Sequence, residues 1–251
     1  MLIEDSLNRN SVELMLANAH VAYIADIADV HIGNVLHNKK KLQNTISKIL
    51  EIPNFYVLIG GDSTDNSSTQ SASSVFDEYA HGFDQIQECV KALEPLKHRI
   101  LGVRSGNHGY QRARKYNALA PEQIVAQFLG VPFLQGCVTI FLGVGKYLYT
   151  IGSWHNSKPP SKMEWLHTDV TFYEHLHKND IQRSIVLEPN KYVRKWVSRE
   201  HYDIQSGSFL AYGGYAAEKG YRPLPIGCPV VRFDGANRRI IPYYDVSQIQ
   251  S

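Results

Sequence analysis

Acidic, amide and imidazole side chains follow one another along this chain in short groups, and side chains of these types can hold metal ions. The groups are Asp29-Val30-His31, Gly61-Asp62, Gly106-Asn107-His108, a lone His155 and His175-Leu176-His177. Mixed oxygen and nitrogen donors suit divalent manganese, and also iron, zinc or nickel. The sequence therefore predicts a metal site, provided that folding brings the groups together.

The spacing within these groups favours ligands that act in pairs. Asp29 and His31 are two residues apart, so in an extended segment their side chains point the same way. His175 and His177 have the same spacing, so one imidazole each could serve two neighbouring ions. Asp62 follows two glycines, which let the backbone turn tightly, and its two carboxylate oxygens could bridge two metals.

The first four groups each follow a short apolar run that predicts a β-strand. These runs are residues 21–25, 55–59, 100–103 and 147–151. In open α/β sheets, ligands collect at the carboxyl ends of the strands. We therefore expect the four groups to lie close together at one edge.

The remaining apolar pattern indicates a sandwich of two sheets. Spacings of three and four residues predict helices at residues 39–50, 75–96 and 121–130, and more weakly at 5–19. Further strands are expected at 138–144, 170–173, 185–187, 228–233 and 239–244, with hairpin turns at 145–146 and 235–237. The first half thus alternates strand and helix, and the second half is mostly strand. Two sheets on a common core with helices outside satisfy both halves.

Composition narrows the class of protein. The 251 residues, 43% of them hydrophobic, suit a single domain over 1–251. The net charge is only +2, so charge alone does not predict nucleic-acid binding. Cys89, Cys137 and Cys228 are widely spaced, which predicts reduced thiols. Without a signal-like start or an apolar window of ~20 residues, we expect a cytoplasmic protein with no membrane partner; no feature indicates an oligomeric partner.

Taken in order, the groups resemble the pattern of the calcineurin-like metallophosphoesterase superfamily. That pattern is D-x-H, G-D-x-x-D, G-N-H-[D/E], H and G-H-x-H, and the likeness spans residues 21–233. Each motif alone is weak, but the ordered set is specific. The resemblance, in particular to compact bacterial and phage phosphoesterases, implies an α/β fold: a two-sheet β-sandwich flanked by helices in four α/β/β/α layers.

The resemblance also implies roles for individual residues. Two ligand sets that share one bridging carboxylate are implied: Asp29, His31, Asp62 and His177 for the first metal, and Asp62, Asn107, His155 and His175 for the second. His108 would be the imidazole beside the scissile phosphate. Such a site hydrolyses phosphoesters with a hydroxide activated by two divalent ions, here most simply manganese.

Basic and acidic neighbours of these motifs add weaker expectations. Arg112 and Arg114 follow His108 closely enough to contact a substrate phosphate, although ordinary solvation explains them equally well. Asp65 is expected to brace its loop rather than to bind metal.

Structural explanations compete with metal binding at some ligands. Asp62 could cap a turn, and Asn107 could be a turn residue with positive φ.

Three features depart from the family pattern: the residue after His108, the residue before His175 and the residues on either side of His155. Gly109 stands where a carboxylate usually follows the Gly-Asn-His triplet, so His108 is expected to be less basic unless another carboxylate reaches it. Glu174 replaces the glycine before the paired histidines, and Trp154 and Asn156 flank His155. Because of these changes, the chain could also be a low-activity or specialised member of the superfamily.

Three functions remain in competition. The first is a metal-dependent phosphodiesterase acting on nucleic acid or nucleotide, such as a nuclease. The second is a phosphomonoesterase, including a protein phosphatase. The third is a low-activity or non-catalytic metal-binding interaction protein.

Overall fold

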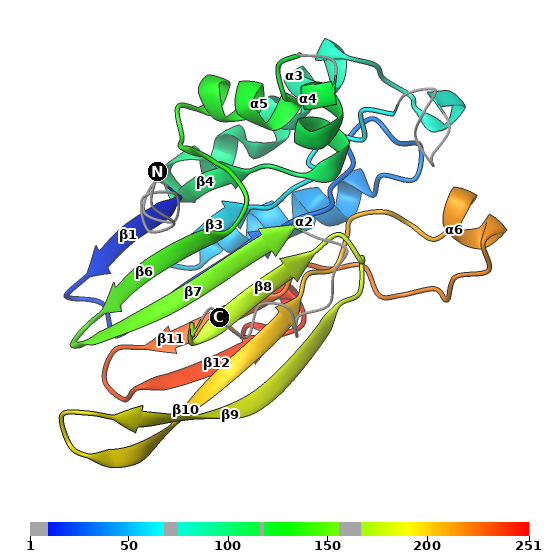
Figure 1. Cartoon of the computed structure of the whole chain (residues 1–251). Helices are drawn as coiled ribbons and strands as arrows, with labels where there is room; N and C mark the ends of the chain where they lie inside the picture. The colour runs from blue at the N-terminus through cyan, green and yellow to red at the C-terminus, as the bar shows by residue number, and fades with distance from the viewer. Residues whose placement is uncertain (1–9, 68–74, 116–117, 156–166, 251) are drawn as a thin grey trace.

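The strands in the described part of the chain form two mixed six-stranded sheets (Figure 1). The computed structural model describes residues 10–67, 75–115, 118–155 and 167–250. Sheet A contains, in spatial order, β1 (Ser11–Leu16), β6 (Val138–Val144), β7 (Tyr147–His155), β8 (Val170–Glu174), β10 (Lys195–Gln205) and β9 (Asp180–Asn190). Sheet B contains β12 (Arg239–Tyr243), β11 (Val230–Asp234), β2 (Val21–Ile27), β3 (Phe55–Ile59), β4 (Ile100–Arg104) and β5 (Phe133–Leu134).

Helices flank this sandwich. They are α2 (Lys39–Glu51), α3 (Phe83–Leu93), α4 (Arg112–Lys115), α5 (Pro121–Leu129) and α6 (Gly214–Glu218). Among the described residues, the longer helices α2, α3 and α5 gather on the side of sheet B (Figure 1). The described residues also form short helical turns: η1 (Val75–Asp77), η2 (Glu94–Arg99), η3 (Asn107–Gln111) and η5 (Val246–Gln248). The predicted two-sheet sandwich flanked by helices is confirmed.

Strand β3 in the middle of sheet B is apolar throughout, because both of its faces are covered. In β3, Val57 and Ile59 belong to the core between sheet and helices, whereas Leu58 belongs to the core between the two sheets. Strands β2, β3, β4 and β5 are parallel neighbours. Their carboxyl ends therefore lie along one edge, where the segments that follow β2, β3 and β4 carry Asp29, Asp62 and Asn107.

Sheet A brings the remaining groups to the same region. Strands β7 and β8 are parallel, and their register pairs His155 with Glu174 at their last residues. His175 and His177 follow directly after β8. The ends of both sheets thus supply the groups that the sequence singled out.

The expected helix over residues 5–19 is wrong in its described part. Residues 11–16 form β1, which pairs in parallel with β6. Val12, Leu14 and Leu16 pack against the core between the sheets, while Glu13 and Met15 are exposed. Alternation with a period of two fits a strand, and the apolar residues were too few to establish a helical stripe. Residues 1–9 lie outside the described part of the chain.

The single helix expected over residues 75–96 is also wrong. Residues 75–77 form the turn η1, and α3 starts only at Phe83, after Gly82 with φ of 51°. Phe76 is 92% exposed, so the first part of the expected apolar stripe does not face the core. Ile86 and Leu93 in α3 are buried as the pattern required.

The strands β9 and β10, the cysteines and the helix lengths can also be compared with the expectations from the sequence. Strand β10 was not anticipated, and its partner β9 is longer than the expected strand at 185–187. Cys89, Cys137 and Cys228 are free thiols. Among the described residues, none of the helices has the length and apolar character needed to cross a membrane.

Candidate metal centre

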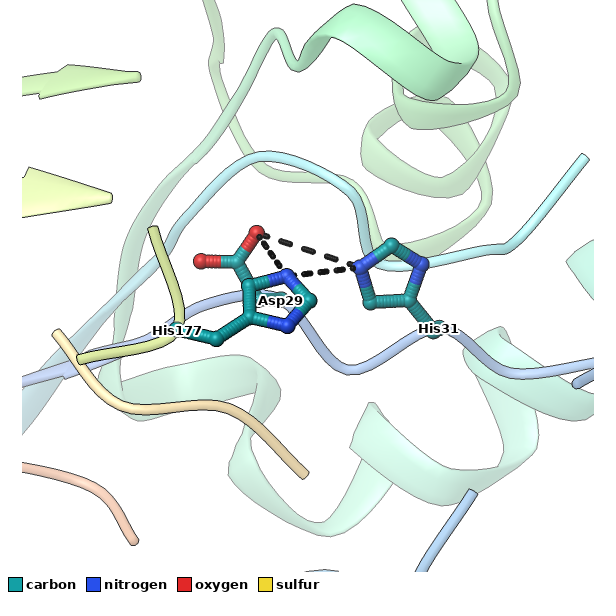
Figure 2. A group of neighbouring side chains, drawn as sticks. All are labelled: Asp29, His31 and His177. Carbon is teal, nitrogen blue, oxygen red and sulfur yellow. Dashed lines mark hydrogen bonds and ion pairs between the residues drawn. The ribbon is translucent and has the colours of Figure 1, made fainter. Parts of the chain in front are cut away.

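The first group of candidate ligands is formed by Asp29, His31 and His177, whose side chains converge in Figure 2. His31 Nε2 lies 3.2 Å from His177 Nε2. Asp29 Oδ1 lies 3.4 Å from His177 Nε2 and 3.9 Å from His31 Nε2. One oxygen and two nitrogens therefore face a common point, although 146 residues separate the two histidines.

Neighbouring groups hold these side chains in place. Asp29 Oδ2 accepts a hydrogen bond of 2.9 Å from the backbone N–H of His175, which turns Oδ1 toward the imidazoles. His31 Nδ1 donates to Asp65 Oδ1 at 2.8 Å, so Nε2 is the nitrogen left to bind a metal. Burial raises the pKa of Asp29, but His177 and His155 together outweigh burial and hold the pKa at about 2. The carboxylate is thus ionised at neutral pH.

The second group is formed by Asp62, His155 and His175, with Asn107 beside them. Asp62 Oδ2 lies 3.1 Å from His155 Nε2 without the angle of a hydrogen bond. Asn107 Oδ1 lies 2.6 Å from the same nitrogen. Burial lowers the pKa of His155, but Asp62 and Glu174 outweigh burial and raise it well above its usual value. The group therefore attracts positive charge.

The backbone at these residues is unusual. Asp29, His31, Asp62, His175 and His177 have φ angles of 49°, 51°, 56°, 84° and 53°. A left-handed backbone at a non-glycine residue costs on the order of 1–3 kcal/mol and persists where the surroundings enforce it, often at functional sites. Asn107 does not have a positive φ, so the turn explanation for that residue is not supported.

Unpartnered oxygens show that the two groups fit divalent cations. Asp29 Oδ1 and Asp62 Oδ2 are buried and have no hydrogen-bond partner among the described residues. Each faces an imidazole nitrogen, at 3.4 Å for Asp29 and 3.1 Å for Asp62, so its negative charge is balanced when that ring is protonated or when a cation is bound. The donors are carboxylate, amide and imidazole, which divalent transition metals accept. All seven predicted ligands lie in one of the two groups, and the bridging role of Asp62 remains a prediction.

His108 lies beside both groups. Its Nδ1 donates to the backbone carbonyl of Asp65 at 2.8 Å and lies 3.7 Å from Asp65 Oδ1. Its Nε2 lies 3.9 Å from Asp62 Oδ2. Burial lowers the pKa of His108 to about 4, so the imidazole is neutral at pH 7.

The carboxylate of Glu122 fills the space in which a side chain at position 109 would lie. A Cβ at Gly109 would lie 2.0 Å from Glu122 Oε2, so the glycine leaves the space that this side chain fills. Glu122 is the second residue of α5, is fully buried, and has no hydrogen-bond partner for either oxygen among the described residues. A carboxylate from α5 thus lies beside Gly109, although Glu122 makes none of the polar contacts that the described structure gives His108.

Glu174 takes part in a buried network of charges. Its carboxylate accepts hydrogen bonds from the backbone N–H of Gly61 at 2.6 Å and from Ser153 Oγ at 3.1 Å. His155 Nδ1 lies 3.0 Å from Glu174 Oε2, and Arg104 forms an ion pair with the same oxygen. The left-handed turn falls on His175 rather than on Glu174, which explains why glycine is not needed at position 174.

Comparison with known proteins found only distant likenesses. No protein family and no curated protein matches the chain at a significant level. Among solved structures, the chain is similar to a predicted phosphoesterase from Streptococcus pneumoniae, with 14% identity, a TM-score of 0.39, and 85% of this chain and 84% of that chain covered. It is similar to Vps29 complexed with zinc from Entamoeba histolytica, with 11% identity, a TM-score of 0.41, and coverage of 88% and 97%.

A third similar structure is a putative 5'-nucleotidase from Staphylococcus aureus, with 12% identity and a TM-score of 0.46. The likeness covers 89% of this chain and 53% of that longer one. Likenesses at this level do not assign a function. The proposals below therefore rest on the arrangement of the side chains.

The two arginines near His108 have different surroundings. Arg112 donates to the backbone carbonyls of Asp65 and Asn66 at 3.1 and 2.8 Å, so it braces the loop that holds His31 and His108. Arg114 is exposed, with its guanidinium over the ring of Tyr110 at 5.6 Å. Contact of either arginine with a substrate remains a prediction.

Arg104 and Glu122 were not recognised in the sequence. Arg104 ends the otherwise apolar strand β4, and a charge at the end of a fully buried strand signals that a partner must lie nearby. Glu122 gave no such signal, because an acidic residue after a helix-starting proline is ordinary. Asp65 was expected to brace its loop, and the structure shows it bonded to His31, Asn34 and Ser67.

Proposed function

We propose that this chain is a metal-dependent phosphodiesterase that acts on nucleic acid or nucleotide. The observation that carries the proposal is the pair of adjacent donor groups, each with a buried carboxylate oxygen that lacks a hydrogen-bond partner among the described residues. The residues proposed to hold two divalent ions are Asp29, His31 and His177 in one group, Asn107, His155 and His175 in the other, and Asp62 between them.

The proposed chemistry divides between the ions and the chain. When bound, two divalent ions supply positive charge to the phosphoryl oxygens and lower the pKa of water toward neutrality. The chain supplies the orientation: Asp65 holds the ring of His31, and Glu174 holds the ring of His155. Donors that the chain itself holds in place do not have to be oriented by the substrate.

His108 is proposed to handle the proton of the leaving oxygen. Its Nδ1 is engaged by the Asp65 carbonyl, so Nε2 is the nitrogen available to the substrate. The negative charge of a phosphodiester raises the pKa of a neighbouring imidazole. Nε2 can then carry a proton from solvent to the departing alkoxide. Arg112 and Arg114 are proposed to contact the phosphate.

The test of the function is hydrolysis of bis-p-nitrophenyl phosphate by purified protein with Mn²⁺. Asp62→Ala should lose both metal and hydrolysis while keeping its circular dichroism spectrum, because it removes one of the two unpartnered oxygens. Asp84→Ala, an exposed carboxylate of α3, is the matched control and should behave as wild type. Equal hydrolysis by wild type and Asp62→Ala would contradict the proposal.

His108→Asn tests the role of the imidazole separately from metal binding. We expect turnover to fall by about 10²–10⁴-fold, the usual effect of losing a general acid or base. Two equivalents of manganese should remain bound, as measured by elemental analysis. Loss of metal in this variant would show that His108 is a ligand, and the assigned roles would then be wrong.

Side-by-side assays distinguish hydrolysis of phosphomonoesters from hydrolysis of phosphodiesters. p-Nitrophenyl phosphate reports monoester hydrolysis, and single-stranded DNA, duplex DNA and cyclic nucleotides report the diester classes. A chain that prefers the monoester would be a phosphomonoesterase. A chain that binds two manganese ions and hydrolyses none of these esters would be a metal-binding protein instead.

A further inference from the structure

A buried chain of charges leads from the core to one side of the candidate metal centre. Arg104 and Glu174 are both fully buried, at 0% exposure, and lie at the ends of β4 in sheet B and β8 in sheet A. Their ion pair therefore joins the two sheets. Beyond Glu174 lies His155, and beyond His155 lie Asp62 and Asn107.

We propose that Glu174 is a positioning residue for His155 in the second metal group, and that Arg104 holds Glu174 in place for this task. The proposal rests on the proposed metal centre but not on the reaction that it performs. Nothing in the motif pattern requires an acid at position 174, where the resemblance leads one to expect glycine.

The contact with Glu174 fixes which ring nitrogen of His155 faces the candidate metal site. With Nδ1 donating to Glu174 Oε2 at 3.0 Å, Nε2 is left facing Asp62 Oδ2 and Asn107 Oδ1. A histidine that donates one ring N–H to a carboxylate binds metal through the other nitrogen, and its basicity as a ligand is raised. Glu174 does for His155 what Asp65 does for His31 in the first group.

The surroundings of Glu174 leave it little freedom to move. Gly61 N–H and Ser153 Oγ each donate to it, from β3's end and from β7. A Cβ at Gly60 would lie 2.7 Å from Glu174 Cδ, so the backbone also packs closely against the carboxylate. Such a side chain holds its partner within a narrow range of positions.

Arg104 supplies the charge that keeps this carboxylate buried. An isolated buried anion is costly, and removing one partner of a buried ion pair exposes that cost. Glu174→Gln alone would leave the Arg104 guanidinium unpaired, so loss of metal in that variant could reflect damage to the fold. A test must remove both charges together.

The experiment therefore compares wild type with the double variant Arg104→Met/Glu174→Gln. Manganese titration by calorimetry gives the number of sites and the affinity of each. We expect the double variant to stay folded, because replacing a buried ion pair by neutral groups is often tolerated. Its affinity for one manganese ion should fall by about 10–100-fold, the usual effect of losing a ligand's supporting carboxylate, while the other ion binds as in wild type.

Asp65→Asn is the matched control, because it changes the supporting carboxylate of His31 and should weaken the other ion. In the same manganese titration, Asp65→Asn should lower the affinity of one site, and the double variant should lower the affinity of the other. Wild-type affinity at both sites in the double variant would overturn the proposal. Equal weakening of both sites would also overturn it, because a merely structural role predicts that result.

A measurement on the unaltered chain keeps the proposal testable if the double variant does not fold. In protein with two equivalents of Zn²⁺, ¹⁵N resonances of His155 should show Nε2 bound to metal and Nδ1 carrying a hydrogen-bonded proton. Metal on Nδ1, or a chain that does not bind a second ion, would overturn the proposal. Two bound ions with no hydrolysis of any phosphoester would contradict the proposed function and leave this inference standing.

Discussion

Gly109 and Glu122 are fitted to one another although they belong to different elements. The carboxylate of Glu122 occupies the space that a side chain at position 109 would need. A carboxylate on residue 109 itself, as in the pattern that the chain resembles, would compete with Glu122 for the same volume. Gly109 and Glu122 therefore form a packed pair, in which the absence of a side chain at position 109 makes room for the carboxylate.

This fit predicts that Gly109→Ala destabilises the protein. A Cβ 2.0 Å from Glu122 Oε2 forces the buried carboxylate or the turn to move, and overpacking of this kind costs about 1–3 kcal/mol. Urea unfolding measures the loss. Gly152→Ala is the control, because its new Cβ would meet neighbours at an ordinary 3.5 Å. Equal stability of the two variants would show that Glu122 moves aside freely.

Glu122 also predicts a dependence of stability on pH. Burial and the nearby Asp62 raise the pKa of Glu122 to about 7, whereas its unfolded value is 4.5. Because the folded pKa is the higher one, the neutral acid favours folding below pH ~4.5, and this contribution is lost as the pH rises toward 7.

Glu122→Gln should therefore match wild type in free energy of unfolding near pH 4.5 and exceed it at pH 8, by up to about 3 kcal/mol. Urea unfolding of both proteins without metal gives the comparison. The difference in free energy of unfolding between the two proteins does not contain the contribution of the histidines, because both proteins have the same histidines. A difference that does not change between the two pH values would contradict the shifted pKa.

At the scale of elements, the sequence predicted what depends on local pattern. Strands β2, β3 and β4 were expected because they are continuous apolar runs, and both of their faces are indeed covered. Strand β10 was missed because it carries Arg199, Glu200 and Asp203 on a largely exposed surface, without an apolar run. Register and pairing of such a strand depend on its partner β9, which lies outside any local window.

The candidate site divides in the same way. Its seven proposed ligands were recognised because their types and order along the chain carry the signal. The supporting charges Arg104 and Glu122 were not, because each is ordinary in its own segment. Their meaning comes from a neighbour that only folding brings close: Glu174 for Arg104, and Gly109 for Glu122.

Strand β1 offers a test at this scale, because a helix and a strand bury different residues. Leu14→Ala should lower the free energy of unfolding by about 1–2 kcal/mol, since Leu14 packs partly buried against the core between the sheets. Glu13→Ala, on the exposed face, should leave stability within about 0.5 kcal/mol of wild type. Urea unfolding of both variants decides the matter, and a larger effect at Glu13 would contradict the assignment of a strand.

At the scale of the whole molecule, the two sheets meet at the candidate metal centre. The ends of sheet B supply Asp29, Asp62 and Asn107, and the ends of sheet A supply His155 and His175. Ions held between them should stabilise the folded state, because they bind donors that only the folded chain brings together.

Manganese should therefore raise the melting temperature. At a concentration 100 times the dissociation constant, one site adds about 2.7 kcal/mol to the free energy of unfolding. Differential scanning calorimetry with Mn²⁺ and with chelator measures the shift, and Asp62→Ala should reduce it. A melting temperature that manganese leaves unchanged in wild type would argue against the centre.

The junction of the two sheets also sets how much disturbance the chemistry can tolerate. Side chains such as Leu58 and Phe172 fill the layer between the sheets, on the strands that lead to Asp62 and to His175. We expect truncation of one of them to loosen the packing of sheet A on sheet B, and a displacement of about 1 Å at the candidate site is enough to cost on the order of 10² in rate. Such a variant would lose activity while it is still folded. The cause would be an apolar core residue, which a search for polar motifs does not select.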